Sequence, residues 1–180
     1  MTRILSYNIL VGGKRRIDNI ERMIRGADPD IVGLVEANDP EVVKELAQRL
    51  DMEYRINLPP AGEWAPSLAL LSRLPIISTT IHPHPGLRAK SLLEVSVQEA
   101  HGERLTVFVT HLEASFPKLR GGDYIRRAEL LQILPLMRTS HGPHILIGDF
   151  NSLAPGDRLM GSNLLRYMVT LDQHKAMDLS

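Results

Sequence analysis

Polar side chains stand at the ends of four segments that otherwise have the apolar pattern of buried strands. These are Asn8 in "SYNI", Glu36 in "GLVEAN", Asp149 with Asn151 in "GDFN", and His111 in "VFVTHLEA". Carboxylate and amide oxygens are the ligands that hard cations such as Mg²⁺ or Mn²⁺ prefer. An imidazole beside them could neutralise a phosphate oxygen or move a proton. Together these residue types are those of metal-assisted phosphoester hydrolysis.

The stretch "HILIGDFNSL", residues 144–153, has the most informative spacing. A run of β-prone residues ends abruptly in Gly148, Asp149, Phe150 and Asn151. Side chains at positions i and i+2 of a strand point to the same face. We therefore expect Asp149 and Asn151 to project together from the C-terminal tip of a strand, where they could bind a ligand.

Each of these residues also has a structural interpretation. Asn8 could be a hydrogen bonder at a strand end, and Glu36 could begin a helix-capping loop. Asp149 and Asn151 could stabilise an Asx-turn after the strand. His111 could be a partly buried residue bonded to the backbone. The spacing alone does not decide between these interpretations, because it does not show that the residues converge in space.

Composition narrows the function classes. A length of 180 residues with 43% hydrophobic residues predicts one domain over residues 1–180 with a single core. The 21 basic and 21 acidic residues balance, which disfavours a strongly basic nucleic-acid binder but leaves nucleic acid open as a substrate. There is no cysteine, so disulfides, thiolate metal sites and cysteine nucleophiles are excluded.

The chain also has no apolar run that approaches the length of a membrane span. Its first residues, "MTRILSYNIL", lack the long apolar region and small-residue cleavage site of a signal peptide. We therefore expect a cytoplasmic protein with no membrane partner.

Periodicity predicts the elements that must position the polar residues. Strands are predicted over residues 3–10, 28–38, 53–58, 67–72, 76–81, 91–98, 104–112 and 144–150. Helices are predicted over residues 15–27, 41–50 and 123–134, the second beginning after Asp39 and Pro40 and the third stopped or kinked by Pro135. Helices alternate with strands early and a hairpin follows, which favours a layered α/β structure with a mixed sheet or two sheets.

Five strings occur in an order that resembles a known family. "YNIL", "DIVGLVE", "ALLSRLPI", "VFVTHLEAS" and "ILIGDFNS" are similar to motifs of the endonuclease/exonuclease/phosphatase family, the deoxyribonuclease I-like group of Mg²⁺-dependent phosphodiesterases and phosphatases. The resemblance covers residues 3 to about 155. It implies an α/β (α+β) four-layer sandwich, in which two mixed β-sheets pack face to face with helices outside. It also implies Mg²⁺ or Mn²⁺ as cofactor and a phosphoester, which includes nucleic acid, as substrate.

The resemblance assigns a role to each candidate residue. Glu36 matches the principal metal-binding carboxylate, and Asn8 matches the residue that organises the metal and phosphate end of the site. Three residues match catalytic positions. His111 corresponds to the histidine that contacts the scissile phosphate, Asp149 to the aspartate that positions or deprotonates water, and Asn151 to the amide that holds the phosphate.

The chain departs from the family pattern in two ways. Val35 stands where the family often has Gln, although the ligand Glu36 is present. Family members continue past "GDFN" into further strands and a closing Ser-Asp-His motif, whereas this sequence stops at "LDQHKAMDLS", and we do not expect His174 to replace the missing histidine. We therefore expect the N-terminal portion of the fold, incomplete at its C-terminus.

Such a chain would have an open sheet edge through which it could self-associate. The expected function is a metal-dependent phosphoester hydrolase, with weak or no activity in the 180-residue chain itself. The alternative is an inactive or truncated family member that acts as a phosphate- or protein-binding domain.

Overall fold

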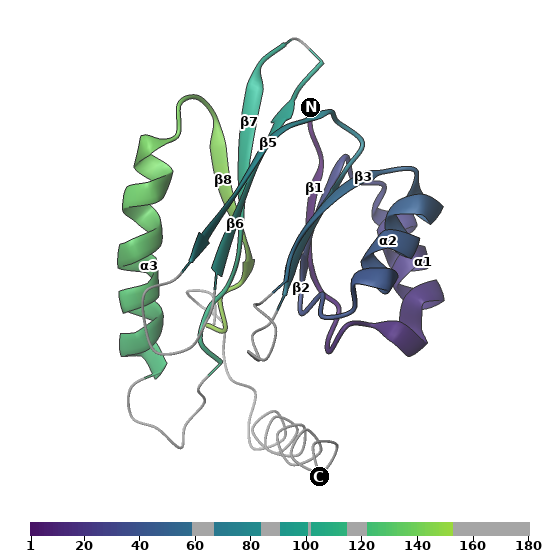
Figure 1. Ribbon diagram of the computed structural model, residues 1–180, viewed down its shortest axis with the longest axis horizontal. Helices are drawn as coiled ribbons and strands as arrows, with labels where there is room; N and C mark the ends of the chain where they lie inside the picture. The colour runs from purple at the N-terminus through teal and green to yellow at the C-terminus, as the bar shows by residue number, and fades with distance from the viewer. Residues whose placement is uncertain (59–66, 84–90, 101, 115–121, 153–180) are drawn as a thin grey trace.

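The computed structural model describes residues 1–58, 67–83, 91–100, 102–114 and 122–152 (Figure 1). In chain order its elements are β1 (Ile4–Asn8), η1 (Lys14–Arg16), α1 (Ile17–Ala27), β2 (Ile31–Val35), α2 (Pro40–Leu50), β3 (Glu53–Asn57), β4 (Leu68–Ser72), β5 (Ile76–Pro83), β6 (Ser91–Gln98), β7 (Arg104–His111), α3 (Gly122–Thr139) and β8 (His144–Asp149). The predicted domain over residues 1–180 extends past the described residues, and His174 lies outside them.

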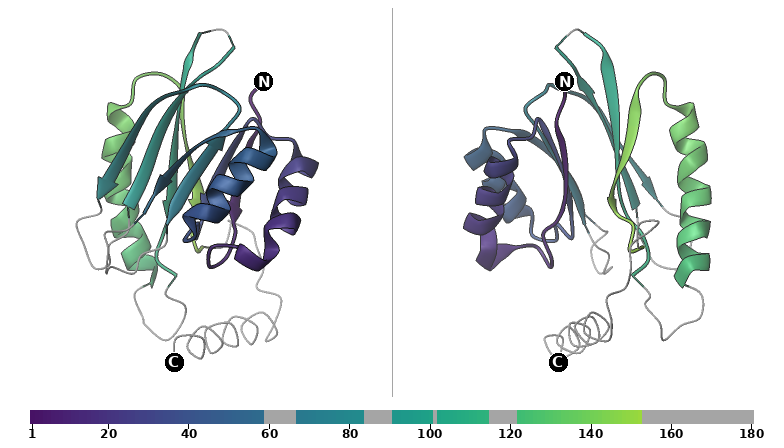
Figure 2. Two further views of the ribbon diagram at one scale, coloured as in Figure 1. Left: turned by 45° about the vertical axis from the view of Figure 1, so that its right-hand side comes forward. Right: turned by 180° about the vertical axis from the view of Figure 1, so that it is seen from behind.

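The strands form two four-stranded sheets. The first has the order β1-β2-β4-β3, in which β1 and β2 are parallel and the other pairs antiparallel. The second has the order β5-β6-β7-β8, in which only β7 and β8 are parallel. The sheets face each other, with α1 and α2 outside the first and α3 outside the second (Figures 1 and 2). The predicted sandwich of two mixed sheets with helices outside is therefore confirmed.

Strand β2 lies at the centre of the packing and is buried along its whole length. Ile31 and Val35 belong to the apolar core between the two sheets. Val32 and Leu34 point the other way, into the core beneath α1 and α2. This alternation follows from the two-residue period of a strand, and it explains why a central strand reads as a continuous apolar run.

Gly33 of β2 faces the second sheet, and side chains of that sheet fill the space beside it. A Cβ atom built on Gly33 would lie 2.5 Å from Cδ1 of Ile147 and 3.5 Å from Cγ2 of Val109. Ile147 belongs to β8 and Val109 to β7, so any larger residue at position 33 would push the second sheet away. The absence of a side chain here lets the ends of β2 and β8 come together.

The helices begin much as predicted, but one ends later. The side chain of Asp39 caps α2 by accepting a hydrogen bond from the Glu41 backbone N–H at 3.1 Å, with Pro40 at the first helical position. The expectation that Pro135 stops the third helix is wrong as to its end, because α3 continues through Pro135 to Thr139.

Burial explains this continuation of α3. Ile133, before the proline, is fully buried against the second sheet, and Leu136 and Met137, after the proline, pack against the same cluster. The free energy gained by burying these side chains offsets the cost of about 3 kcal/mol for a proline inside a helix. Within the described part of the chain, no helix combines the length and hydropathy that a membrane span requires.

Candidate active site at the strand ends

Asn8 joins the two acidic residues that the sequence analysis singled out. Its amide nitrogen Nδ2 donates to Oε1 of Glu36 at 3.3 Å and to Oδ2 of Asp149 at 2.9 Å. Its amide oxygen accepts the backbone N–H of Leu10 at 2.9 Å. Asn8 and Asp149 are 141 positions apart in the chain and belong to different sheets. The packing of the two sheets, therefore, creates this contact.

The parallel pairing of β1 and β2 places the first two residues. Asn8 is paired with Val35, so Glu36 follows directly at the end of the neighbouring strand. Glu36 has a left-handed backbone with φ of 56°, which turns the chain out of the strand. Its side chain is nevertheless buried, with only 9% of the residue exposed.

Backbone groups of the loop after β1 hold Glu36 in place. The N–H of Val11 donates to Oε2 of its carboxylate at 2.8 Å. The N–H of Gly12 donates to the backbone carbonyl of Glu36, also at 2.8 Å. Because both the backbone and the carboxylate are bonded, the orientation of this side chain is fixed before any ligand binds.

Asp149 and Asn151 form the Asx-turn considered in the sequence analysis, and their side chains also bond to Asn8 and to the end of β7. The backbone N–H of Asn151 donates to Oδ1 of Asp149 at 2.9 Å, which is the hydrogen bond of an Asx-turn. The other carboxylate oxygen of Asp149 remains bonded to Asn8. The amide nitrogen of Asn151 donates to the carbonyl of Leu112 at 2.9 Å, so the turn is tied to the end of β7.

His111 is brought to the same edge by the parallel pairing of β7 and β8. It is the register partner of Asp149, and the backbone N–H of the next residue, Leu112, donates to the Asp149 carbonyl at 2.9 Å. Since Val107 and Val109 belong to the core between the sheets, the alternation of the strand places His111 on that inner face as well. The residue is buried, with 8% of its surface exposed.

The candidate site holds two acidic side chains, Glu36 and Asp149, and the described residues supply no basic side chain that pairs with them. Among the residues that the structure describes, neither Glu36 nor Asp149 forms an ion pair with lysine or arginine. A buried carboxylate beside a second one is unfavourable unless a cation or additional hydrogen bonds compensate it. Over the same described ranges, no group of three His, Cys, Asp or Glu side chains gathers at one point.

Four of the six non-glycine residues with positive φ in the described chain lie at this edge. They are Leu10 at 52°, Val11 at 49°, Glu36 at 56° and Asn151 at 47°. The other two, at positions 28 and 51, are ordinary left-handed caps at the ends of α1 and α2. Such backbone strain persists only where the surroundings enforce it, and it concentrates at functional sites.

Sequence reasoning missed the backbone groups that build this site. The clamp of Val11 and Gly12 on Glu36 was not anticipated, nor was the role of the Leu112 carbonyl. The pair Gly12-Gly13, one residue after "YNIL", is the signal that could have indicated a left-handed loop here. A backbone N–H or carbonyl has no residue-type signature, and so the other contacts could not be found by inspection.

Residues 5–168 match the model of the Endonuclease/Exonuclease/phosphatase family. The chain belongs to this family. The resemblance of the five strings is thereby confirmed, although the match does not test the role of any single residue. A comparison of the sequence with curated proteins found no match.

Solved structures show the family fold at low sequence identity. Humanized TDP2 of D. rerio superposes with a TM-score of 0.67 at 20% identity over 85% of this chain and 63% of its own. ANGEL2, a 2',3'-cyclic phosphatase, gives 0.66 at 20% identity over 86% and 54%. The human Nocturnin catalytic domain gives 0.66 at 19% identity over 84% and 64%. The chain thus spans less than two thirds of each of these family structures.

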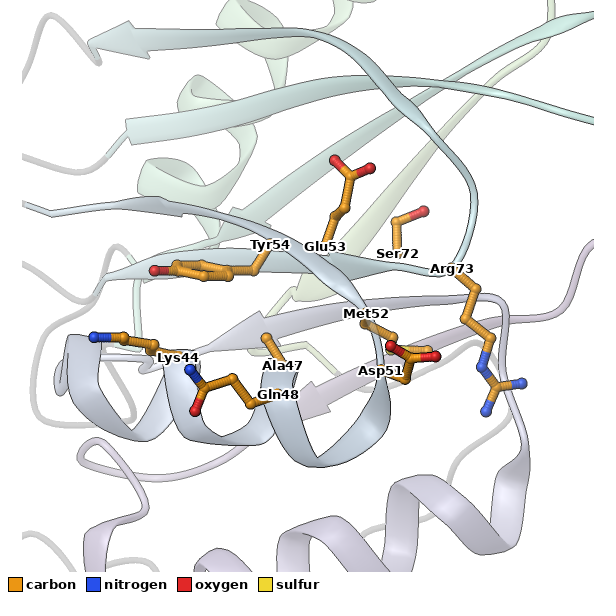
Figure 3. A pocket seen from close by; sticks show the side chains of 9 residues that line it. All are labelled: Lys44, Ala47, Gln48, Asp51, Met52, Glu53, Tyr54, Ser72 and Arg73. Atoms are coloured by element: carbon orange, nitrogen blue, oxygen red, sulfur yellow. The ribbon is translucent and has the colours of Figure 1, made fainter.

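A surface hollow elsewhere is separate from the family's strand-end site. It has a volume of ≈ 390 Å³ and lies between α2 and the first residues of β3, with Asp51, Met52 and Ser72 among its lining (Figure 3). Ser72 pairs with Ile31 at the start of β2, whereas Glu36 follows the other end of that strand. The hollow is therefore at the opposite end of the first sheet, and it contains no candidate catalytic residue.

Proposed function

We propose that this protein is a metal-dependent phosphoester hydrolase that uses a divalent cation, Mg²⁺ or Mn²⁺, at the edge formed by β1, β2, β7 and β8. The observation that carries this proposal is the pair of carboxylates, Glu36 and Asp149, held by the single amide of Asn8. Membership of a family of phosphoesterases supports the same reaction class.

The donor set fits a hard cation. Two carboxylates converge from different elements, with the Asn8 amide nitrogen bonded to both, and no lysine or arginine of the described residues neutralises them. Mg²⁺ is usually bound by one or two carboxylates and completes its shell with water and substrate oxygens, so a three-carboxylate cluster is not required. When bound, the ion would lower the charge on the phosphate and acidify a water molecule.

Glu36 is the residue we assign to the ion, because its carboxylate is buried and oriented by Val11. The Asn8 amide oxygen is engaged by Leu10 and its nitrogen faces both carboxylates. In this arrangement the residue positions the two acids, and direct ligation through its oxygen stays a prediction.

The remaining residues have chemistry suited to phosphate and water. Asp149 can orient the attacking water and accept its proton, because its carboxylate is held at the strand tip by Asn8 and by the Asx-turn. His111 and Asn151 flank it and can donate hydrogen bonds to phosphate oxygens as negative charge develops. The NH₂ group of an asparagine has two donors, so its bond to Leu112 does not exhaust it.

The relatives indicate the range of substrates to test. One structure of D. rerio TDP2 is a complex with a single-strand DNA product, and one of ANGEL2 is a complex with adenosine-2',3'-vanadate. Both ligands are nucleotide phosphoesters or their analogues. We infer a phosphoester substrate for this chain, with nucleotides as the first class to assay even though the balanced charge disfavours indiscriminate duplex binding.

Hydrolysis of bis-p-nitrophenyl phosphate by the purified chain tests the proposal. We expect slow release of p-nitrophenolate that requires Mg²⁺ or Mn²⁺ and falls about 100-fold or more in Glu36→Gln and in Asp149→Asn. Glu103→Gln is the matched control, because Glu103 is an exposed carboxylate after the β6 strand with no role in the site. Activity that survives both site substitutions would contradict the proposal.

The alternative is a domain that binds phosphate or a protein without turnover. It is favoured by one observation, namely that no three His, Cys, Asp or Glu side chains of the described residues are placed to hold a metal ion together. Metal-dependent binding of phosphate without release of p-nitrophenolate would select this alternative.

A further inference from the structure

The loop after β1 has a backbone that suits only two of its four residues. Leu10, Val11, Gly12 and Gly13 all have positive φ, at 52°, 49°, 74° and 68°. Glycine adopts this conformation freely. Leucine does so at a cost, and a β-branched valine in the left-handed region is a genuine outlier. Folding stability alone would therefore favour glycine or asparagine at positions 10 and 11.

Burial of the side chains does not offset the backbone strain at Leu10 and Val11. Leu10 is 38% exposed and Val11 is 63% exposed. An apolar side chain stabilises a fold chiefly by the area that it removes from water, so these two contribute little for the strain that they cause. Leu10 and Val11 thus combine a strained backbone with an apolar side chain that is exposed to water.

Neighbouring groups nevertheless enforce the conformation. The N–H of Leu10 is bonded to the Asn8 side chain, and the N–H of Val11 is bonded to the Glu36 carboxylate. Arg16 holds the loop from its other side, because its guanidinium donates to the carbonyl of Ile9 at 2.6 Å and to that of Leu10. The backbone of each exposed apolar residue is therefore bonded directly to a residue of the candidate active site.

This combination separates Leu10 and Val11 from the other left-handed residues. Asp28 and Asp51 are polar, which lowers their cost in this conformation, and they cap helices. Leu10 and Val11 are the two apolar members among the described residues, and both are exposed while their backbone N–H groups are bonded to Asn8 and Glu36.

We propose that Leu10 and Val11 form an apolar subsite that contacts the organic group esterified to the phosphate. This inference rests on the proposed function, since it requires a phosphate at the carboxylate edge. The preferred substrate class is then a phosphoester that carries an apolar or aromatic face close to phosphorus, such as a base or an aryl group. A small polar alcohol would gain nothing from these side chains.

Two phosphonates that differ only in their organic group test the subsite without turnover. Phenylphosphonate and methylphosphonate are titrated into the chain with Mg²⁺ present, and binding is followed by calorimetry. Covering about 55 Å² of apolar surface predicts that the phenyl compound binds about tenfold more tightly, which corresponds to about 1.4 kcal/mol. In Val11→Asn and Leu10→Asn we expect this ratio of the two affinities to fall to about threefold or less.

The midpoint of thermal unfolding supplies a second measurement. The Val11→Asn substitution should raise this midpoint if Val11 is a strained subsite residue, and should lower it if Val11 stabilises the fold by packing. Asparagine accepts the left-handed conformation better than valine, so Val11→Asn should raise the unfolding midpoint by about 2 to 4 °C. Asp51→Asn is the matched control, because it places asparagine at a left-handed residue with φ of 54° beside the distant hollow (Figure 3). It should leave both phosphonate affinities unchanged.

The outcomes separate the two proposals. Equal affinity of the unsubstituted chain for both phosphonates, or a phenyl preference that survives both substitutions, would overturn the subsite while methylphosphonate binding still supports the phosphate site. A lowered midpoint in Val11→Asn would also overturn it, since Val11 would then be a packing residue. Failure of both phosphonates to bind would contradict the proposed function itself and the subsite with it.

Discussion

Gly148→Ala should damage the fold and the site together. Gly148 immediately precedes Asp149 and has φ of 140°, which non-glycine residues rarely adopt. A Cβ atom at this position would lie 1.9 Å from the carbonyl oxygen of Thr110, its register partner on β7. The clashing group belongs to the backbone and cannot rotate away.

The size of the effect follows from this contact. Real Cβ atoms essentially never come closer than 3.0 Å to another heavy atom, so the strands must separate by about 1.1 Å at this point. The strain of the φ angle contributes about 1 to 2 kcal/mol. Distorting the hydrogen bonds between β7 and β8 adds about 1 to 3 kcal/mol. We expect a total loss of about 2 to 5 kcal/mol in the free energy of unfolding.

Urea denaturation followed by circular dichroism measures this loss, and two other glycines supply the controls. Gly102→Ala introduces strain alone, because φ is 80° and nothing lies within 4 Å of the new Cβ, so about 1 kcal/mol should be lost. Gly26→Ala in α1 introduces neither strain nor contact and should stabilise the chain by up to about 1 kcal/mol. If Gly148→Ala lost no more than Gly102→Ala, the inferred packing of β7 against β8 would be wrong.

Three further predictions follow from the site charge, the sheet edge and the ion pairs. Glu36→Gln should lose the gain in stability of about 1.4 kcal/mol that we expect when Mg²⁺ exceeds its Kd tenfold. Thermal denaturation with and without Mg²⁺ measures this gain, and a gain retained in the variant would place the ion elsewhere. Ile145 is 37% exposed on β8, which pairs only with β7 in the described chain, so Ile145→Lys should reduce self-association in sedimentation velocity if that edge mediates it. Hydrogen bonds from Arg25, and to a smaller extent from Arg49, lower the pKa of Glu21 in the folded chain. The ionised carboxylate therefore stabilises the fold fully at a pH above its ordinary pKa of about 4.3. This contribution is lost as the pH falls through the lowered pKa of the folded state. Glu21→Gln should therefore lose less stability between pH 6 and pH 3 than the unsubstituted chain in urea titrations, and equal losses would contradict the assignment.

The elements were predictable because their signals are local. The apolar period of Ile17, Ile20 and Ile24 predicts α1, and the alternation over residues 91–98 and 104–112 predicts the hairpin of β6 and β7. Pro135 is the exception. Its local signal ends a helix, whereas burial of Ile133 against the second sheet is a tertiary effect that keeps α3 intact.

The sequence predicted which residues belong to the candidate site, but not how they contact one another. Residue type and position at a strand end identify Asn8, Glu36 and Asp149 as candidates, and the roles that the resemblance implies for them stay predictions. That Asn8 contacts both acids depends on how two sheets pack at Gly33 and Ile147, which no local pattern encodes. The strained loop at Leu10 could not be read from the sequence for the same reason.

The location of a bound divalent ion tests the central claim most directly. Mn²⁺ broadens nuclear magnetic resonance signals of nearby amides, so a titration with Mn²⁺ places the ion without requiring turnover. We predict that the amides of Val11, Gly12 and Asn151 broaden first, that those of Ser72 and its neighbours do not, and that Glu36→Gln abolishes the effect. Broadening that spreads over exposed carboxylates, or that persists in Glu36→Gln, would contradict the account.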